Sequence, residues 1–112
     1  MEVMIEQSDS FSTIYASGEI DAVTCAKLEE TLNDLMDNGQ QKIILDFKDV
    51  DYISSAGLRV ILKTLQKLEG VGQLVVTRMN EDVSEIIEMA GFQNIMDVYD
   101  DLEKAQRAFA GG

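Results

Sequence analysis

Two adjacent hydroxyl groups, those of Ser54 and Ser55, are the side chains of this sequence best placed to do chemistry. They lie within the stretch 52–58, YISSAGL, which follows a strand-like run and leads into a helical pattern. At the start of a helix, free backbone N–H groups and the helix dipole favour an added negative charge. A serine at such a junction can cap the helix, and it can also carry a phosphate. The residue types alone leave both interpretations open.

The groups that usually activate a nucleophile are missing. The chain has no histidine, which removes the commonest general base and every Ser-His or Cys-His pair. It also lacks the Gly-x-x-x-x-Gly-Lys loop that holds nucleotide phosphates. Its one cysteine, Cys25, has no basic cluster beside it and is interpreted as a packing residue. We therefore expect no catalytic residue, no enzymatic activity and no cofactor; a small nucleotide-binding or hydrolytic protein is the competing class.

Three aspartates before the serines, Asp46, Asp49 and Asp51, invite a calcium-binding interpretation. Their spacing does not fit, because an EF-hand loop needs a glycine at its sixth position and a glutamate at its twelfth. Counted from Asp46, those positions hold Asp51 and Gly57. We therefore expect no metal site.

Composition and charge limit the class of protein. The chain has 112 residues, of which 46% are hydrophobic, enough for one domain, 1–112, with one core. It shows no apolar run of membrane-spanning length, no signal-peptide pattern and no cysteine pair, so we expect a cytoplasmic protein that does not bind membranes. A net charge of −12 repels nucleic acid. The acids suit a basic protein partner, or they only keep the domain soluble.

Hydrophobic spacing predicts a β-hairpin followed by alternating helices and strands. Asp21 is the expected N-cap of the first helix, and Asn38-Gly39 its expected stop. Because crossovers between strands of one sheet are right-handed, the later strands are expected to be parallel. The result is an α/β domain with a mixed sheet of four or five strands and about four helices. The predicted strands are 1–7, 11–17, 42–47, 73–78 and 95–99, and the later helices follow the serine stretch, Asn80, and Asp100 or Asp101.

The segment 46–58, DFKDVDYISSAGL, resembles the phosphorylation loop of anti-sigma factor antagonists, which belong to the STAS domains shared with sulphate transporters. The stretch 18–21, GEID, resembles the second landmark of that family, a Gly-Glu-apolar-Asp turn before the first helix. The two landmarks have the matching separation, and the resemblance covers nearly the whole chain with the same order of elements. It implies a STAS-like fold.

The resemblance also implies a site. The phosphorylated serine of the family lies two residues before the glycine, which corresponds to Ser55. The residue before it is often aspartate and here is Ser54, so a second hydroxyl can compete as acceptor and a fixed negative charge is missing. We expect the partner-binding residues to be Asp21, Ser54, Ser55, Gly57 and Leu58. Gly57 would allow a close backbone approach, and Leu58 would face either the core or a partner.

The resemblance implies a partner-switching function. The unphosphorylated antagonist binds an anti-sigma factor that is also an ATP-dependent serine kinase, phosphorylation separates the pair, and a metal-dependent serine phosphatase reverses the modification. On this basis we expect a cytoplasmic regulator of transcription that contacts no nucleic acid itself and is a monomer when free. The alternative within the same fold is a scaffold or transport-accessory domain that is not switched by phosphorylation.

Overall fold

The chain begins with the antiparallel hairpin that its alternating sequence predicts. In the computed structural model, which describes residues 1–110, β1 (Glu2–Gln7) pairs with β2 (Ser12–Ile20). The turn between them is closed by Ser8, whose backbone N–H donates to the carbonyl of Phe11 at 2.9 Å. The last two residues of the predicted domain 1–112 lie outside the described residues.

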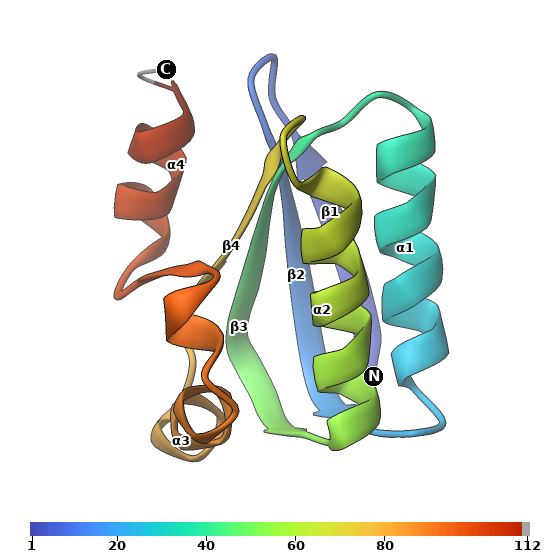
Figure 1. Cartoon of the computed structure of the whole chain (residues 1–112), viewed down its shortest axis with the longest axis vertical. Coiled ribbons are helices and arrows are strands. Elements are labelled where there is room, and N and C mark those ends of the chain that lie inside the picture. Colours follow the sequence, from blue (N-terminus) through green and yellow to red (C-terminus); the bar gives the residue numbers. More distant parts are fainter. Residues whose placement is uncertain (111–112) are drawn as a thin grey trace.

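The remaining strands continue the sheet in chain order, which confirms the predicted mixed α/β fold. The sheet order is β1-β2-β3-β4-β5, and every pair after the hairpin is parallel. Helices α1 and α2 cover one face, α4 covers part of the other, and α3 lies beyond the end of β4 (Figure 1). The further elements are α1 (Cys25–Asp37), β3 (Lys42–Ile53), α2 (Ser55–Leu68), β4 (Gln73–Thr77), α3 (Glu81–Met89), β5 (Asp97–Tyr99) and α4 (Leu102–Ala110).

Several helix ends lie where the sequence predicts them. α1 ends at Asn38-Gly39, where Gly39 adopts a φ of 85° that few side chains tolerate. Asn80 caps α3, its side-chain oxygen accepting from the N–H of Val83 at 2.7 Å. Of the two candidates for α4, Asp101 accepts from the N–H of Lys104 at 2.8 Å. Local capping chemistry therefore sets these boundaries.

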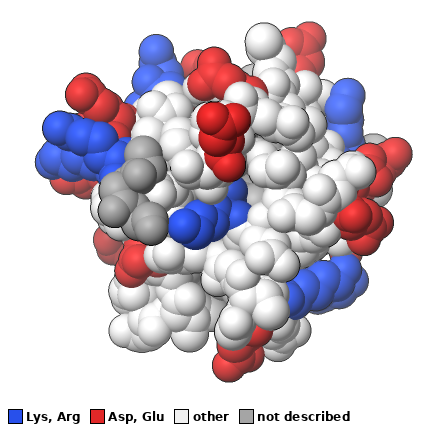
Figure 2. Space-filling view, turned by 90° about the horizontal axis from the view of Figure 1, so that it is seen from above, with Lys and Arg blue, Asp and Glu red and all other residues white. Residues whose placement is uncertain are grey.

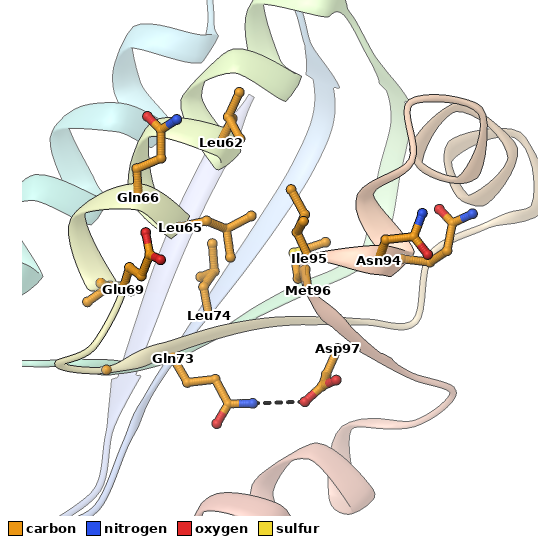
Figure 3. A pocket seen from close by; sticks show the side chains of 13 residues that line it. Leu62, Leu65, Gln66, Glu69, Gln73, Leu74, Asn94, Ile95, Met96 and Asp97 are labelled. Atoms are coloured by element: carbon orange, nitrogen blue, oxygen red, sulfur yellow. Dashed lines mark hydrogen bonds between the residues drawn. The ribbon is translucent and has the colours of Figure 1, made fainter.

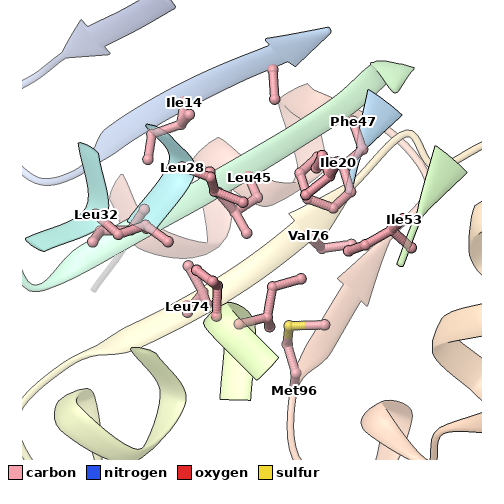
Figure 4. Close-up of a cluster of buried hydrophobic side chains, with 14 of the residues drawn as sticks. Ile14, Ile20, Leu28, Leu32, Leu45, Phe47, Ile53, Leu74, Val76 and Met96 are labelled. Atoms are coloured by element: carbon pink, nitrogen blue, oxygen red, sulfur yellow. The ribbon is translucent and has the colours of Figure 1, made fainter. Parts of the chain in front are cut away.

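Two unequal cores hold the layers together. The larger lies between the sheet and helices α1, α2 and α3, and includes the fully buried Leu28, Leu45 and Phe47 (Figure 4). The smaller lies under α4. It consists of Ile44, Val75, Ala105 and Phe109, with Phe11, Tyr99 and Leu102 at its margin.

Strand boundaries differ from the prediction at several places, by one residue at the starts of β1 and β2 and for clear physical reasons elsewhere. β2 continues to Ile20 and β3 to Ile53, because their polar ends pair with each other and remain strand. In the region of the last strand, a 3-10 helix, Phe92–Asn94, comes first and β5 begins only at Asp97. β4 stops at Thr77, since Arg78 has a left-handed φ of 58° that ends the strand.

The end of the molecule at which β3 and β4 begin carries both signs of charge. Figure 2 views this end, and shows acidic and basic side chains spread around uncharged surface. It therefore offers no continuous patch of one charge. Among residues 1–110, none of the helices combines the length and apolar character that crossing a membrane requires.

Candidate functional site

The two sequence landmarks lie side by side at the opposite end of the sheet. Parallel pairing aligns Glu19 with Tyr52 and Ile20 with Ile53 at the ends of β2 and β3. The N–H of Ser54 then donates to the carbonyl of Ile20 at 2.8 Å, one residue beyond the last pair. This register brings the GEID turn and the serine stretch onto one surface.

The two serines divide the capping and the exposed positions between them. Ser54 has an extended backbone, with φ −90° and ψ 174°, and its Oγ accepts from the N–H of Gly57 at 3.4 Å. Ser55 is the first residue of α2 and is exposed. The helix cap is thus supplied by Ser54, and the hydroxyl of Ser55 faces solvent at the positive end of the helix dipole.

The charges around this helix start are uneven. The first turn of α2 contains no acidic residue, so nothing within the helix offsets the positive end of its dipole. Just outside it, the ends of β2 and β3 expose Glu19, Asp49 and Asp51. A negative group added at Ser55 would therefore gain from the helix and be repelled by its neighbours.

Gly57 allows the first turn of α2 to lie directly on the strand ends. It is buried, and a Cβ at this position would come within 2.7 Å of Ile53 Cγ1 and 2.8 Å of Ile20 Cγ2. The close approach expected of this glycine is therefore present. Because it is buried, Gly57 positions the serines and exposes little surface of its own.

The apolar surface near the serines includes side chains that the sequence prediction did not single out. Leu58 packs partly against the larger core, so it faces inward more than outward. Tyr52 is 46% exposed and Val23 is 84% exposed. Strand alternation could not have indicated Tyr52, because Asp51 and Tyr52 are both exposed between the buried Val50 and Ile53. Val23 lies in a turn, where no periodicity applies.

Asp21 makes the hydrogen bonds of the predicted N-cap, and its own carbonyl accepts from the N–H of Cys25 at 2.9 Å, although the regular part of α1 starts later than the sequence predicts. The helix begins one turn later, after Thr24. Asp21 Oδ1 accepts from the N–H groups of Val23 and Thr24, both at 2.9 Å, and these bonds hold the pKa of its carboxyl below the usual 3.8. The hydroxyl of Thr24 accepts from the N–H of Asp21 at 2.9 Å and donates to the carbonyl of Glu19 at 2.7 Å. Asp21 thus fixes the turn between β2 and α1.

The aspartates before the serines serve different purposes. Asp46 is 2% exposed and forms a two-bond ion pair with Arg78, one bond being Nε to Oδ1 at 3.1 Å. Its hydrogen bonds raise the pKa of the Arg78 guanidinium, so the pair stays charged. Asp49 and Asp51 are exposed and point to no common ligand. Within residues 1–110, no three acidic or thiol side chains come together as metal ligands.

The sequence as a whole matches a known family. The profile described as the STAS domain matches residues 2–105. BtrV of Bordetella bronchiseptica, described as a candidate anti-sigma factor antagonist, is 34% identical over 110 residues, which cover 97% of this chain and 95% of BtrV. The chain belongs to the STAS domain family. The resemblance seen in its two landmarks is thereby confirmed.

Solved structures agree with this STAS fold. An anti-sigma factor antagonist from Mycobacterium paratuberculosis superposes with a TM-score of 0.90 at 25% identity, covering 97% of this chain and 93% of that one. The phosphorylated form of the Bacillus cell fate determinant SpoIIAA superposes with a TM-score of 0.74 at 18% identity, covering 96% and 99%. At that identity the second likeness concerns the fold.

Proposed function

We propose that this STAS domain is an anti-sigma factor antagonist that binds its anti-sigma factor when unphosphorylated and is released by phosphorylation of Ser55. The observation that carries the proposal is the exposed hydroxyl of Ser55 on an acid-free first helical turn, beside the turn held by Asp21. The names of the relatives BtrV and the mycobacterial antagonist support the same role.

The physical effect of a phosphate differs between the free and the bound protein. A phosphoserine adds about −1.5 to −2 charges and three acceptor oxygens. In the free protein, the N-terminus of α2 stabilises that charge by about 0.3–1 kcal/mol, so the fold tolerates it. In a closely packed complex the same dianion must lose its water, which costs far more than the helix returns. Phosphorylation is therefore expected to dissociate the complex without unfolding the domain.

The surface around Ser55 indicates what the partner offers. Glu19, Asp49 and Asp51 are exposed there on a chain of net charge −12, which suits a basic surface on an anti-sigma factor. Tyr52 and Val23 supply apolar area of the kind that anchors interfaces. We assign the ATP-dependent kinase activity to that partner and the reversal to a metal-dependent serine phosphatase, so the domain itself binds and does not catalyse.

The site of modification can be tested by incubating the protein with its kinase and ATP. We expect one phosphate, on Ser55, in tandem mass spectra of the peptide that contains both serines. Ser55→Ala should abolish the modification, whereas the matched variant Ser54→Ala should keep it. Phosphate on Ser54, with Ser55→Ala still fully modified, would overturn the assignment.

The consequence for binding can be measured by calorimetry with the anti-sigma factor. Phosphorylated protein should bind at least about 100-fold more weakly than unmodified protein, since a reversal from mostly bound to mostly free needs two or more orders of magnitude. Ser55→Ala should keep full affinity. Equal affinities for the phosphorylated and unmodified proteins would favour the alternative of a scaffold that is not switched.

The role of Asp21 separates structure from recognition. Asparagine can accept the same two N–H bonds, so Asp21→Asn should leave the melting temperature nearly unchanged. If the carboxylate also contacts the basic partner, the variant should lower affinity by about tenfold. Unchanged affinity would restrict the interface to the serine stretch and leave Asp21 as the residue that fixes the turn.

A further inference from the structure

A second surface of the domain, away from the serines, has the form of a binding groove. It lies between α2 on one side and the 3-10 helix with the start of β5 on the other, and has a volume of about 660 Å³. Leu65 from α2, Leu74 from β4 and Met96 converge at its floor (Figure 3). Volume and an apolar floor of this kind are typical of ligand sites.

The walls of the groove leave apolar surface in contact with water. Leu62 on the α2 side is 36% exposed, and Ile95 on the opposite side is 54% exposed. Two exposed side chains facing one groove, with Leu65 between them, form a place for another apolar side chain (Figure 3).

The charged side chains around the groove are all acidic. The carboxylates of Glu69 and Asp97 lie at its margin, and the described residues that line it include no lysine or arginine. Asp97 accepts from the amide of Gln73 at 2.9 Å, a neutral donor that leaves its charge uncompensated. A ligand complementary to this margin is therefore cationic as well as apolar.

The margin also carries free amide groups. The side chains of Gln66, Gln93 and Asn94 line the groove. Within residues 1–110, their amide groups have no hydrogen-bond partner and are available to a ligand. Amides both donate and accept, which matches the N–H and C=O groups of a peptide backbone. This combination favours a polypeptide segment over a compact organic molecule.

We propose that this groove binds a segment of a partner protein in which apolar side chains are flanked by lysine or arginine. Its apolar side chains lie against Leu62, Leu65 and Ile95, above the buried Leu74 and Met96, and its cations lie against Glu69 and Asp97. Ser55 is the first residue of α2, whereas the groove is lined by the second half of that helix. A partner in the groove is therefore compatible with an anti-sigma factor bound at the serines. The domain would then join two proteins.

The test uses nuclear magnetic resonance with isotope-labelled full chain and three synthetic peptides. One has two central leucines flanked on each side by two lysines, the second replaces the lysines by glutamates, and the third replaces the leucines by serines. The first peptide should shift amide signals of 62–74 and 93–97 at millimolar concentration. The other two should shift them much less. Equal responses to all three peptides, or no response to the first, would overturn the proposal.

Variants distinguish binding in the groove from non-specific binding to the protein surface. Ile95→Ser and Glu69→Lys change exposed side chains, so folding should be unaffected, and each should weaken the first peptide by about three- to tenfold. The matched controls Met4→Ser on β1 and Glu30→Lys on α1 also change exposed side chains, away from the groove, and should not weaken it. Concentration-dependent shifts of the groove signals without peptide would identify a second copy of the chain as the occupant, and would refute a foreign partner. None of these outcomes depends on phosphorylation of Ser55.

Discussion

The helices α2 and α3 both begin where a parallel strand ends, but their first turns are built differently. The cap of α3 is strong, because Asn80 accepts from Val83 N–H at 2.7 Å and donates to the carbonyl of Val50 at 3.1 Å. The cap of α2 is the single 3.4 Å contact of Ser54. Glu81 and Asp82 place two acids in the first turn of α3, whereas the first turn of α2 has none.

This difference separates a helix start that is complete in itself from the one at which we propose regulation. The start of α3 is complete, since its own side chains provide both the hydrogen bonds and the negative charge that a helix N-terminus favours. The start of α2 is held instead by packing, through Gly57 on Ile20 and Ile53. Its charge requirement is left unmet beside an exposed hydroxyl. A phosphate on Ser55 would supply by modification what Glu81 and Asp82 supply by sequence.

The largest effect is expected at Gly57. At a helical glycine where an added Cβ would meet no other atom, Gly→Ala would stabilise the protein by about 0.5–1 kcal/mol. Here the new Cβ meets two buried isoleucines below 3.0 Å, and such overpacking costs about 1–3 kcal/mol, so Gly57→Ala should destabilise. Urea unfolding measures the change. A stabilised Gly57→Ala protein would show that packing does not hold this helix start.

The two caps should differ when each is truncated. Asn80→Ala removes two hydrogen bonds and should cost about 1–2 kcal/mol of unfolding free energy. Ser54→Ala removes one long bond and should cost about 0.5 kcal/mol. Both values come from the same denaturation experiment. Equal costs would remove the contrast between the two helix starts.

Adding an acid to the first turn of α2 and removing one from the first turn of α3 should change the stability of the fold in opposite directions. Ser55→Asp adds the missing acid to α2 and should stabilise the fold by about 0.3–1 kcal/mol, while Glu81→Ser removes one from α3 and should destabilise it by a similar amount. Thermal melts at low ionic strength measure both changes. High salt should shrink them, because exposed charges are screened. If both substitutions destabilised the fold, repulsion from the neighbouring acids would outweigh the dipole of α2.

The smallest effect concerns pH and the neighbouring turn. Because hydrogen bonds lower the pKa of Asp21 in the folded protein, its contribution to stability is present above the unfolded value near 3.8 and is lost as pH falls through the folded value. Solvent exposure keeps this contribution small. Urea unfolding at several acidic pH values, compared with Asp21→Asn, isolates it. A wild-type and a variant protein with the same acid dependence would contradict the assignment.

The sequence predicts those features of this fold that depend on local chemistry. The order of strands and helices follows from hydrophobic spacing along each element, and the stop at Asn38-Gly39 and the cap by Asn80 follow from residue types within one turn of chain. The ends of β2 and β3 do not, because their polar residues become strand only by pairing with each other. For the same reason the sequence could assign Ser54 and Ser55 to a helix start but could not tell which of them caps it. The ion pair of Asp46 and Arg78 joins residues that are distant in sequence, and no local pattern indicates it.

The unequal cores have a consequence for how readily different parts of the domain open. α4 rests on Ile44 and Val75 through Ala105 and Phe109, while the larger core joins β2, β3 and β4 to three helices. Few buried contacts and a position at the end of the chain allow a unit to open locally while the rest stays folded. We therefore expect backbone amides of α4 to exchange with deuterium faster than those of α2. The serine surface then belongs to the part that opens slowly. Its geometry is preserved while α4, on the opposite face of the sheet, opens locally.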